Sequence, residues 1–362
     1  MKARRNGSIA LLVVLVVAIQ LLTGLTGTRF YLTQLTMSAY YALVIIGLSV
    51  VMGYAGQISL GHAGFFAIGG YLSAALTTRN LIPFRELGII GMLDKMGLLA
   101  NGQDMYGEQL LTVQPWAACL LALALTVLIA FFIGIPVLKL KGHYLAMATL
   151  GFGTIIHRIV LATPYFGEAD GISDVPGFVL LPAMAGIGPL TVSGDFSARV
   201  ANYYIACFVL VVGMVLLLNL IDSRTGRALR AIHGSEEAAA AMGVDTSRAK
   251  LYVFVLSAVY AALAGVLLVH YNGSIGPGEA SVMKSVRYVA LVAVGGMANL
   301  WGALTMGIVL TFLSMRGVFG SYDDAVFGLI LIGIMLFAPE GILGIRLKSL
   351  VSRFRDSSGA EE

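Results

Sequence analysis

Charged residues are scarce in this sequence. Only 12% of the 362 residues are Asp, Glu, Lys or Arg, and 58% are hydrophobic, whereas a soluble globular chain carries about 25% charged residues. The mean hydropathy is +0.90. Because a soluble protein must cover its surface with polar groups, this composition excludes an ordinary water-soluble domain. We expect lipid to be the solvent that faces most of the chain.

Cysteine is nearly absent, and the common motifs of metal and nucleotide chemistry are missing. The two cysteines, Cys119 and Cys207, lie inside apolar runs, where a thiol acts as a small hydrophobic group. The sequence has no CxxC, HExxH, Gly-x-Ser-x-Gly or GxxxxGK[ST] pattern, and its histidines lack metal-ligand spacing. We therefore expect no catalytic residue, no metal site and no cofactor bound by this chain. Any ATP and Mg²⁺ that its function requires must be bound by other polypeptides.

Long apolar runs, by contrast, are abundant. A helical crossing needs about 20 apolar residues, and the runs that approach or exceed this are Ile9–Thr26, Leu32–Met52, Trp116–Leu138, Tyr203–Ile221 and Tyr252–Val269. The alternating pattern of a membrane β-barrel is absent. The predicted fold class is all-α, a polytopic transmembrane bundle of about ten helices, or eight at the lower limit. We expect one domain over residues 1–362.

The positions of Lys and Arg predict the orientation, because cytoplasmic loops carry an excess of both. Basic residues cluster at the N-terminus, around residues 139–141, in the loop 222–250 and in the C-terminal tail. The loops 79–114 and 164–202 are mixed or acidic, which predicts that they are periplasmic. Helices expected near 9–27, 32–53, 57–78, 115–138, 143–163, 203–221, 251–271 and 325–338 then leave both termini in the cytoplasm.

Two segments of this topology allow more than one interpretation. The N-terminal basic and apolar stretch could be a signal peptide, although its length and the lack of a clear cleavage site favour a first transmembrane helix. Ser285–Arg316 could form two crossings or a re-entrant pair. Lys284 and Arg287 flank the start of that region. Ionisable residues in a membrane are candidates for function, but both side chains could instead extend to the interface.

The segment Gly53–Tyr71, GYAGQISLGHAGFFAIGGY, mixes glycines with Gln57, Ser59 and His62 between two apolar runs. Small residues allow membrane helices to approach closely, and irregular backbone at membrane depth is tolerated where protein or a water-filled cavity covers it. One interpretation is that the three polar side chains line or border a translocation path. The alternative is a tightly packed helix junction whose polar groups bond to one another.

The basic loop around residues 223–254, SRTGRALRAIHGSEEAAAAMGVDTSRAKLYVF, has the features of a short surface helix. Arg227, Arg230 and the alanine-rich stretch Glu236–Met242 suit an amphipathic helix. Gly243 can end it in a left-handed C-cap, and Asp245 or Thr246 can cap the helix that follows. An ordinary basic cytoplasmic loop is the alternative.

Within this loop, Glu237, Ala238 and Ala239, followed by Gly243, resemble the EAA-x-x-x-G loop of ABC-importer permeases. The resemblance implies a coupling helix, formed within the loop 222–250, that docks on a cytoplasmic ATPase subunit. The sequence departs from the family pattern in lacking the trailing Leu-Pro. The residues that the resemblance assigns to ATPase coupling are Arg227, Arg230, Glu236, Glu237, Ala238, Ala239 and Gly243.

Three further blocks extend the resemblance over most of the chain: GIPVLKLKGHYLAMATLGFGTIIH, VGGMANLWGALTMG and FAPEGILG. Together with Gly53–Tyr71 they resemble the LivM-type permease of branched-chain amino-acid ABC importers, a family that also includes urea and short-amide importers. The implied fold is that of an ABC-importer permease in the bacterial inner membrane. The implied function is translocation of branched-chain or related amino acids by alternating access, with no enzymatic activity in this chain.

The resemblance also implies the partners. These are a second permease subunit, two ATPase subunits that bind ATP and Mg²⁺, a periplasmic substrate-binding protein and membrane lipid, with no nucleic acid. Two alternatives remain at this stage: a urea or short-amide permease of the same family, and a stand-alone secondary transporter or channel. The stand-alone protein would need no coupling loop.

Overall fold

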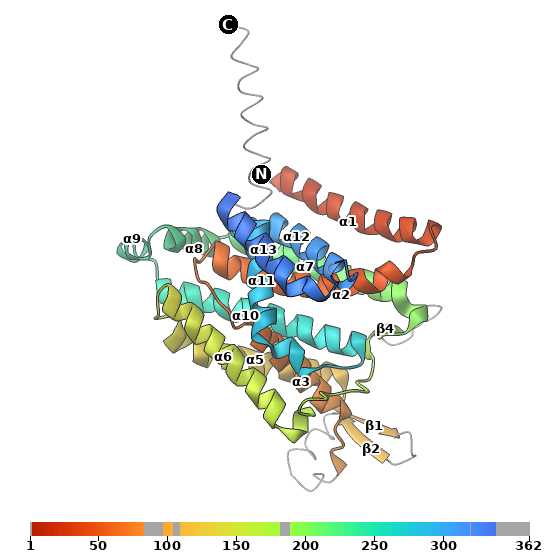
Figure 1. The fold of residues 1–362 in the computed structure, drawn as a ribbon. Coiled ribbons are helices and arrows are strands. Elements are labelled where there is room, and N and C mark those ends of the chain that lie inside the picture. The colour runs from red at the N-terminus through yellow and green to blue at the C-terminus, as the bar shows by residue number, and fades with distance from the viewer. Residues whose placement is uncertain (1, 83–96, 104–108, 182–188, 319, 338–362) are drawn as a thin grey trace, which may run out of the picture.

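The structure is a computed structural model that describes residues 2–82, 97–103, 109–181, 189–318 and 320–337. Within these ranges it is a helical bundle (Figure 1), which confirms the all-α class. The bundle helices are α1 (Lys2–Leu25), α2 (Phe30–Gly53), α3 (His62–Thr78), α5 (Pro115–Val137), α6 (His143–Ala162), α7 (Arg199–Asp222), α10 (Thr246–Asn272), α11 (Val282–Gly295), α12 (Leu300–Met315) and α13 (Asp323–Phe337). Two short helices, α8 (Arg224–Gly234) and α9 (Glu236–Ala241), lie at one end.

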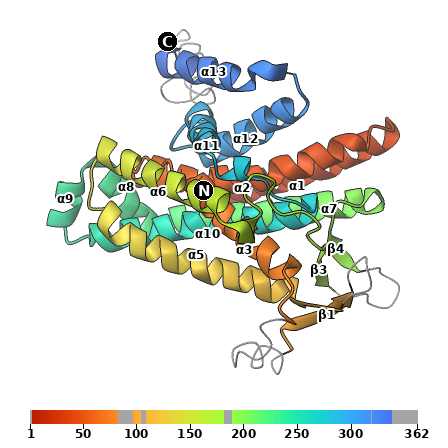
Figure 2. The ribbon, with the colours of Figure 1, turned by 60° about the horizontal axis from the view of Figure 1, so that its bottom comes forward.

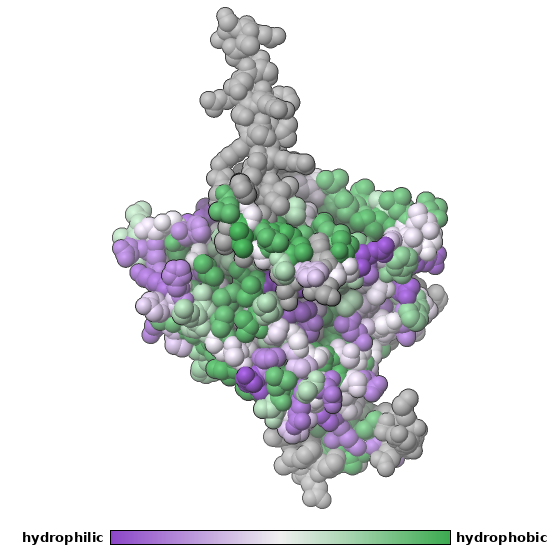
Figure 3. All heavy atoms as spheres, in the orientation of Figure 1, coloured by the Kyte–Doolittle hydropathy of each residue, from purple (hydrophilic) through white to green (hydrophobic). Residues whose placement is uncertain are grey.

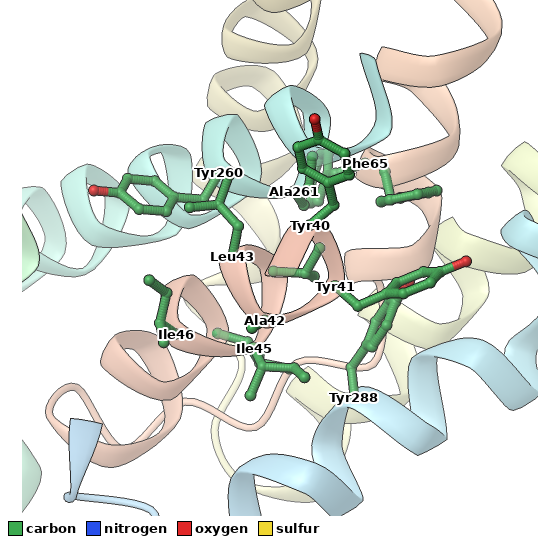
Figure 4. Packing of buried hydrophobic residues seen from close by; sticks show 14 of the residues in the cluster. Tyr40, Tyr41, Ala42, Leu43, Ile45, Ile46, Phe65, Tyr260, Ala261 and Tyr288 are labelled. Atoms are coloured by element: carbon green, nitrogen blue, oxygen red, sulfur yellow. The ribbon is translucent and has the colours of Figure 1, made fainter. Parts of the chain in front are cut away.

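Helices α2, α3 and α10 form the centre of the bundle. Every residue of α2 from Ser38 to Gly53 is buried, and Figure 4 shows Tyr41 beside Tyr288 of α11 and Leu43 beside Tyr260 of α10. Helices α3 and α10 approach so closely that a Cβ on Gly265 would lie 2.1 Å from the Phe66 carbonyl oxygen. Glycine is therefore required at this contact, as expected where membrane helices pack backbone to backbone.

The outer helices carry apolar side chains on their exposed faces. Among the described residues, six helices are long and apolar enough to cross a membrane: α1, α2, α5, α6, α7 and α10. Large exposed residues such as Leu22, Leu120, Phe132 and Phe208 lie on α1, α5 and α7, and hydrophobic surface covers much of the face in Figure 3. Lipid can cover such surfaces without cost, whereas water cannot.

The region Ser285–Arg316 forms two separate helices, α11 and α12. Their turn, residues 296–299, contacts the end of α2, where Tyr54 Oη donates a hydrogen bond of 2.9 Å to the Ala298 carbonyl. The turn is tight because Gly295 and Gly302 pack directly, and a Cβ on Gly302 would lie 1.9 Å from the Gly295 carbonyl oxygen. The turn thus lies near the end of the bundle where α8 lies. With 14 and 16 residues, α11 and α12 are shorter than the helices long enough to cross a membrane, so two crossings and a re-entrant pair both stay open.

Small β-hairpins occupy the opposite end of the molecule (Figures 1 and 2). Strands β1 (Leu99–Gln103) and β2 (Gln109–Val113) pair antiparallel, as do β3 (Phe178–Leu181) and β4 (Leu190–Val192). They belong to the loops 79–114 and 164–202, which the sequence predicts to be periplasmic. Single-turn helices η2 (Pro164–Phe166), η3 (Phe196–Ala198), η4 (Pro277–Ala280) and η5 (Gly320–Tyr322) complete the elements.

Some sequence-based expectations fall outside the described residues. These are the basic C-terminal tail and the FAPEGILG block, in residues 338–362, and the parts of the two loops at 83–96, 104–108 and 182–188. We refer below to the end of the bundle with α8 and α9 as the coupling-loop end. The end with β1–β4 is the hairpin end.

Candidate functional site

The chain between α2 and α3, residues 54–61, is not helical. We expected a helix from residue 57, but α3 begins at His62, so this predicted start is wrong. The reason is local bonding: Gly56 has a left-handed backbone with φ of +67°, and the Leu60 N–H donates to Thr149 Oγ1 at 2.9 Å. Both features prevent a continuous helical ladder. The segment is therefore held by other helices.

His62 lies at the first position of α3 and is completely buried. Its Nδ1 is 3.1 Å from Ser59 Oγ, and its Nε2 is 2.7 Å from Ser257 Oγ on α10. Phe65 and Phe254 surround the ring. With both ring nitrogens bonded to serines, His62 ties the non-helical segment to α10. This arrangement has the features of the packed junction, and it joins two of the three residues predicted to border the path.

Gln57 lies apart from that junction and borders a cavity. The residue is 4% exposed, and neither its amide nitrogen nor its amide oxygen has a hydrogen-bond partner. The cavity has a volume of about 300 Å³, and its polar lining includes Gln57, Lys141, His233, Glu236, Glu237 and Lys250. Unpaired buried amide groups are costly. Of the predicted path residues, Gln57 is therefore the one with polar atoms free to meet a ligand or water.

The loop 222–250 folds into two capped helices in place of the one we expected. Ser223 Oγ accepts from the Gly226 N–H at the start of α8, and Ser235 Oγ accepts from the Ala238 N–H at the start of α9. The extended backbone of Ser235 separates the two helices. As expected, Gly243 follows α9 in the left-handed region at φ +83°, and Asp245 caps α10 by accepting from the Arg248 N–H.

Two ion pairs connect α9 to the bundle, and they differ in strength. Lys250 Nζ on α10 lies 2.5 Å from Glu236 Oε1, and the Lys250 side chain is only 8% exposed. Lys141 Nζ lies 3.6 Å from Glu237 Oε1, with both side chains largely exposed. Exposed pairs contribute little, whereas partly buried ones are less screened by salt and solvent. Glu236 is thus the main electrostatic attachment of α9.

The remaining residues of the predicted coupling set divide into anchored and exposed ones. Arg230 Nη2 donates to the Ile221 carbonyl at 2.7 Å, while its guanidinium lies 6.0 Å from the centre of the Tyr54 ring. Arg227 is exposed and reaches the Asp222 carbonyl at 3.4 Å. On α9, Ala239 is buried and Ala238 is exposed. The loop therefore keeps one face against the bundle and presents the other to solvent.

The two predicted sites meet at Gly56. A Cβ on Gly56 would lie only 2.9 Å from Nδ1 of His233, the residue near the end of α8. The segment 54–61 and the coupling loop are thus in direct contact, and both line the cavity described above. A displacement of α8 and α9 would press directly on the segment that leads to His62.

The family described as branched-chain amino acid transport system permease component matches residues 30–338. The chain belongs to this permease family. Among the described residues of the permease, no group of three or more His, Cys, Asp or Glu side chains is placed to hold a metal ion.

The relatives of the permease are transport subunits. It is 29% identical over 344 residues to the high-affinity branched-chain amino acid transport system permease protein LivM of Salmonella typhimurium, covering 90% of this chain and 73% of the relative. It is 30% identical over 326 residues to LivM of Escherichia coli, covering 85% and 68%. It is 28% identical to LivH of Escherichia coli, covering 85% and 92%. No solved structure matches the permease.

Sequence reasoning missed the residues of the permease that join its two predicted sites. His233 and Lys250 were not selected, and Lys141 was used only as evidence of orientation. Lys250 carried one available signal, because a lysine at the start of an apolar helix requires a counter-charge if its side chain is buried. Nothing in the sequence indicated that Glu236 would supply that charge, since the pair spans the turn at Gly243.

Proposed function

We propose that this permease is the membrane-spanning subunit of an ATP-driven importer that carries branched-chain amino acids into the cell. The chain supplies a path and gates, and it makes or breaks no covalent bond. ATP and Mg²⁺ bind to two separate ATPase subunits. A second permease subunit, identical or homologous, completes the membrane part, and a periplasmic binding protein delivers the substrate. Membership of the permease family supports the type of transporter, and the names of the relatives support branched-chain amino acids as its substrate.

The observation that carries the mechanism is the contact between Gly56 and His233. In an importer of this kind the energy enters at the coupling loop and must reach the path. Here α8 touches the segment 54–61 through His233, and His62 continues the connection to Ser257 on α10. Movement of the coupling loop thus has a short mechanical route to the central helices. Alternating access then follows from two bundle arrangements whose populations the ATPases shift.

The outer face of α9 supports its role as the ATPase dock. Met242, which follows α9, is 84% exposed, and the neighbouring Ala238, Ala240 and Ala241 are also exposed. An apolar surface of this kind at the end of a bundle is typical of a protein interface. In this proposal the coupling-loop end and both termini face the cytoplasm, where the ATPase subunits bind, and the hairpin end faces the periplasm. There Glu168, Asp170 and Asp174 are exposed to a binding protein.

The test is co-purification followed by transport. The tagged permease is isolated from membranes with its partners, identified by mass spectrometry, and reconstituted in vesicles with labelled leucine or labelled urea. We expect an ATPase subunit in the complex and leucine uptake that requires ATP. Urea uptake that requires ATP would support an ATP-driven importer but would show that its substrate is urea. A permease that purifies alone and transports without ATP would instead be a secondary transporter or channel, and the proposal would be wrong.

Coupling is tested in the same vesicles with Gly243→Asp. This substitution puts a side chain at φ +83°, where L-residues are strained, and adds a charge beside α9. ATP-dependent uptake should be lost while the protein still inserts in the membrane. Unchanged uptake by this variant would contradict the coupling role of the loop.

A further inference from the structure

A second polar cluster lies in the bundle, away from the coupling loop. Glu279 in η4 accepts hydrogen bonds from Tyr41 Oη on α2, at 3.0 Å to each carboxylate oxygen. Lys284 Nζ on α11 lies 2.9 Å from Glu279 Oε1 and 3.2 Å from Tyr41 Oη. One carboxylate, one ammonium and one phenol thus form a closed triangle. The two charged side chains are 23% and 26% exposed, so both remain reachable.

Two further hydroxyl groups border this triangle without partners. Tyr71 Oη on α3 and Tyr288 Oη on α11 are buried and make no hydrogen bond, and both lie within electrostatic reach of the Glu279 carboxylate. The Tyr288 ring lies beside Tyr41, with ring centres 6.2 Å apart (Figure 4). Buried hydroxyls without partners are costly. Both hydroxyls are therefore available to a polar ligand that reaches the triangle.

The segment around η4 is fixed in place but has open space beside it. Ile275 pairs with Ile172 through backbone hydrogen bonds of 3.0 and 2.9 Å, and His157 Nδ1 lies 3.1 Å from the Pro277 carbonyl. A Cβ added to Gly276 or to Gly278 would meet no atom within 4 Å. Glu279 is thus held in place by neighbouring elements, beside two glycines whose Cβ positions are open.

Through Tyr41, the ion pair connects η4 and α11 to α2. Glu279 and Lys284 are only five residues apart, so their attraction acts within one stretch of chain. A second pair on α11 differs: Arg287 Nη2 lies 3.1 Å from Asp323 Oδ2 and joins α11 to α13. Charged groups inside a membrane protein are expensive. A partly exposed pair of opposite charges in the bundle is therefore a candidate for a function of its own.

We propose that Glu279 and Lys284 bind the charged headgroup of a zwitterionic amino acid on the hairpin-end side of the permease. The Glu279 carboxylate accepts hydrogen bonds from the α-ammonium group, and the Lys284 ammonium donates to the α-carboxylate. The hydroxyls of Tyr71 and Tyr288 donate to the bound carboxylate groups or accept from the ammonium. In the absence of ligand, the two charges neutralise each other across 2.9 Å. This subsite rests on the proposed function, since it gives the chemical reason for an amino-acid cargo.

The test is protection of a reporter cysteine beside the subsite. Gly278→Cys places a thiol in open space, whereas the native Cys119 and Cys207 are buried and react slowly. The assembled importer is held in lipid nanodiscs, where both faces are accessible, and labelled with a polar maleimide. Leucine should slow the labelling about tenfold near ten times its dissociation constant, because occupancy follows mass action. Isocaproate and isoamylamine, which each keep one charge of leucine, should protect far less, and urea should not protect.

Substitutions then test whether the charges of Glu279 and Lys284 are both needed for protection by leucine. In the reporter background, Glu279→Gln or Lys284→Met should abolish protection by leucine, whereas Lys284→Arg should retain it. Asp323→Asn is the matched control, because it removes a carboxylate of similar exposure from the other ion pair of α11, and protection should persist. The ATPase rate of each complex reports whether the variant is folded and assembled.

Three results would overturn the inference. One is the absence of leucine protection in an importer that takes up leucine with ATP, which leaves the proposed function intact. Another is equal protection by leucine and by a singly charged analogue or urea. The third is full protection in an assembled Glu279→Gln or Lys284→Met variant. Failure of the proposed function itself is seen separately, as the loss of ATP-dependent uptake by the unmodified importer.

Discussion

Lys250 and Glu236 form an ion pair of 2.5 Å across the turn that separates α9 from α10. Their side chains are 8% and 30% exposed, so the pair is largely removed from solvent. It holds a six-residue helix, which could not be stable alone, against the first turn of a central bundle helix. This pair is therefore the more buried of the two ion pairs described for α9.

We predict that Glu236→Gln destabilises the assembled protein, because it leaves the Lys250 ammonium buried without a counter-charge. The expected loss is about 1–3 kcal/mol, measured as a lower thermal unfolding midpoint, with a corresponding loss of ATP-dependent uptake. The double variant Glu236→Gln with Lys250→Met should recover much of the stability, since no buried charge remains. It should not recover coupling if the pair is what positions α9.

The matched control is Glu237→Gln on the neighbouring residue. Its partner Lys141 lies at 3.6 Å, and both side chains are exposed, so the unfolding midpoint should remain near that of the unmodified protein. Equal destabilisation by Glu236→Gln and Glu237→Gln would show that the Lys250 pair has no special role.

A second prediction concerns the contact between the coupling loop and the segment 54–61. Gly56→Ala should destabilise by about 1–2 kcal/mol from its left-handed backbone alone, and its Cβ would also press on His233 at 2.9 Å. Adding His233→Ala should remove the part of the destabilisation that comes from the steric contact. The part that comes from the left-handed backbone of residue 56 should remain. Gly151→Ala is the control, because a Cβ at that helical position of α6 meets nothing within 4 Å. The unfolding midpoint and the uptake rate are measured for the unmodified permease, Gly56→Ala, Gly56→Ala with His233→Ala, and Gly151→Ala. Full uptake by Gly56→Ala would contradict a functional contact between Gly56 and His233.

A third prediction separates the path from the junction. Gln57→Met replaces an amide whose two polar atoms have no partner with an apolar side chain of similar size, so the fold should be unchanged or slightly more stable. If Gln57 borders the path, uptake must nevertheless fall. His62→Ala should instead destabilise the protein by about 2 kcal/mol or more, because it removes two hydrogen bonds and leaves a cavity.

Uptake at the unmodified rate by both Gln57→Ala and His62→Ala would exclude a path-lining role for the segment. Loss of uptake in His62→Ala with a matching loss of folded protein would support the packed junction. Two quantities are therefore measured for each variant: the uptake per folded molecule, and the amount of folded protein in the membrane.

Much of the fold could be predicted from the sequence because a bilayer imposes helix lengths on apolar runs. The observed α5 spans Pro115–Val137 and α6 spans His143–Ala162. The expected ranges were 115–138 and 143–163, so each helix ends one residue earlier than predicted and begins where predicted. Gly243 and Asp245 were also predicted, since the C-cap and the N-cap depend on local backbone chemistry.

The errors occurred where distant residues decide the local structure. Helix α3 begins at His62, later than predicted, because the Leu60 N–H donates a hydrogen bond to Thr149 on α6. No residue near Leu60 in the sequence indicates this long-range bond. The hairpin β1–β2 was missed because its strands, LANGQ and QLLTV, have little apolar alternation. The triangle of Tyr41, Glu279 and Lys284 was missed for a related reason, since Tyr41 on α2 is far in sequence from η4 and α11, which supply the other two residues.

The last prediction concerns the exposed surface of α9. Met242→Glu should leave the permease folded, because the side chain is 84% exposed and packs on nothing that folding requires. If α9 and Met242 dock in an apolar groove of the ATPase subunit, a charge at this position should weaken the complex by about 1–2 kcal/mol, or about tenfold. The measurement is the amount of ATPase subunit that co-purifies as its concentration is varied. Phe196→Glu is the control, because Phe196 is 80% exposed in η3 at the hairpin end. Weakening by both variants would indicate a general loss of folded protein, and weakening by neither would place the ATPase contact elsewhere on the loop.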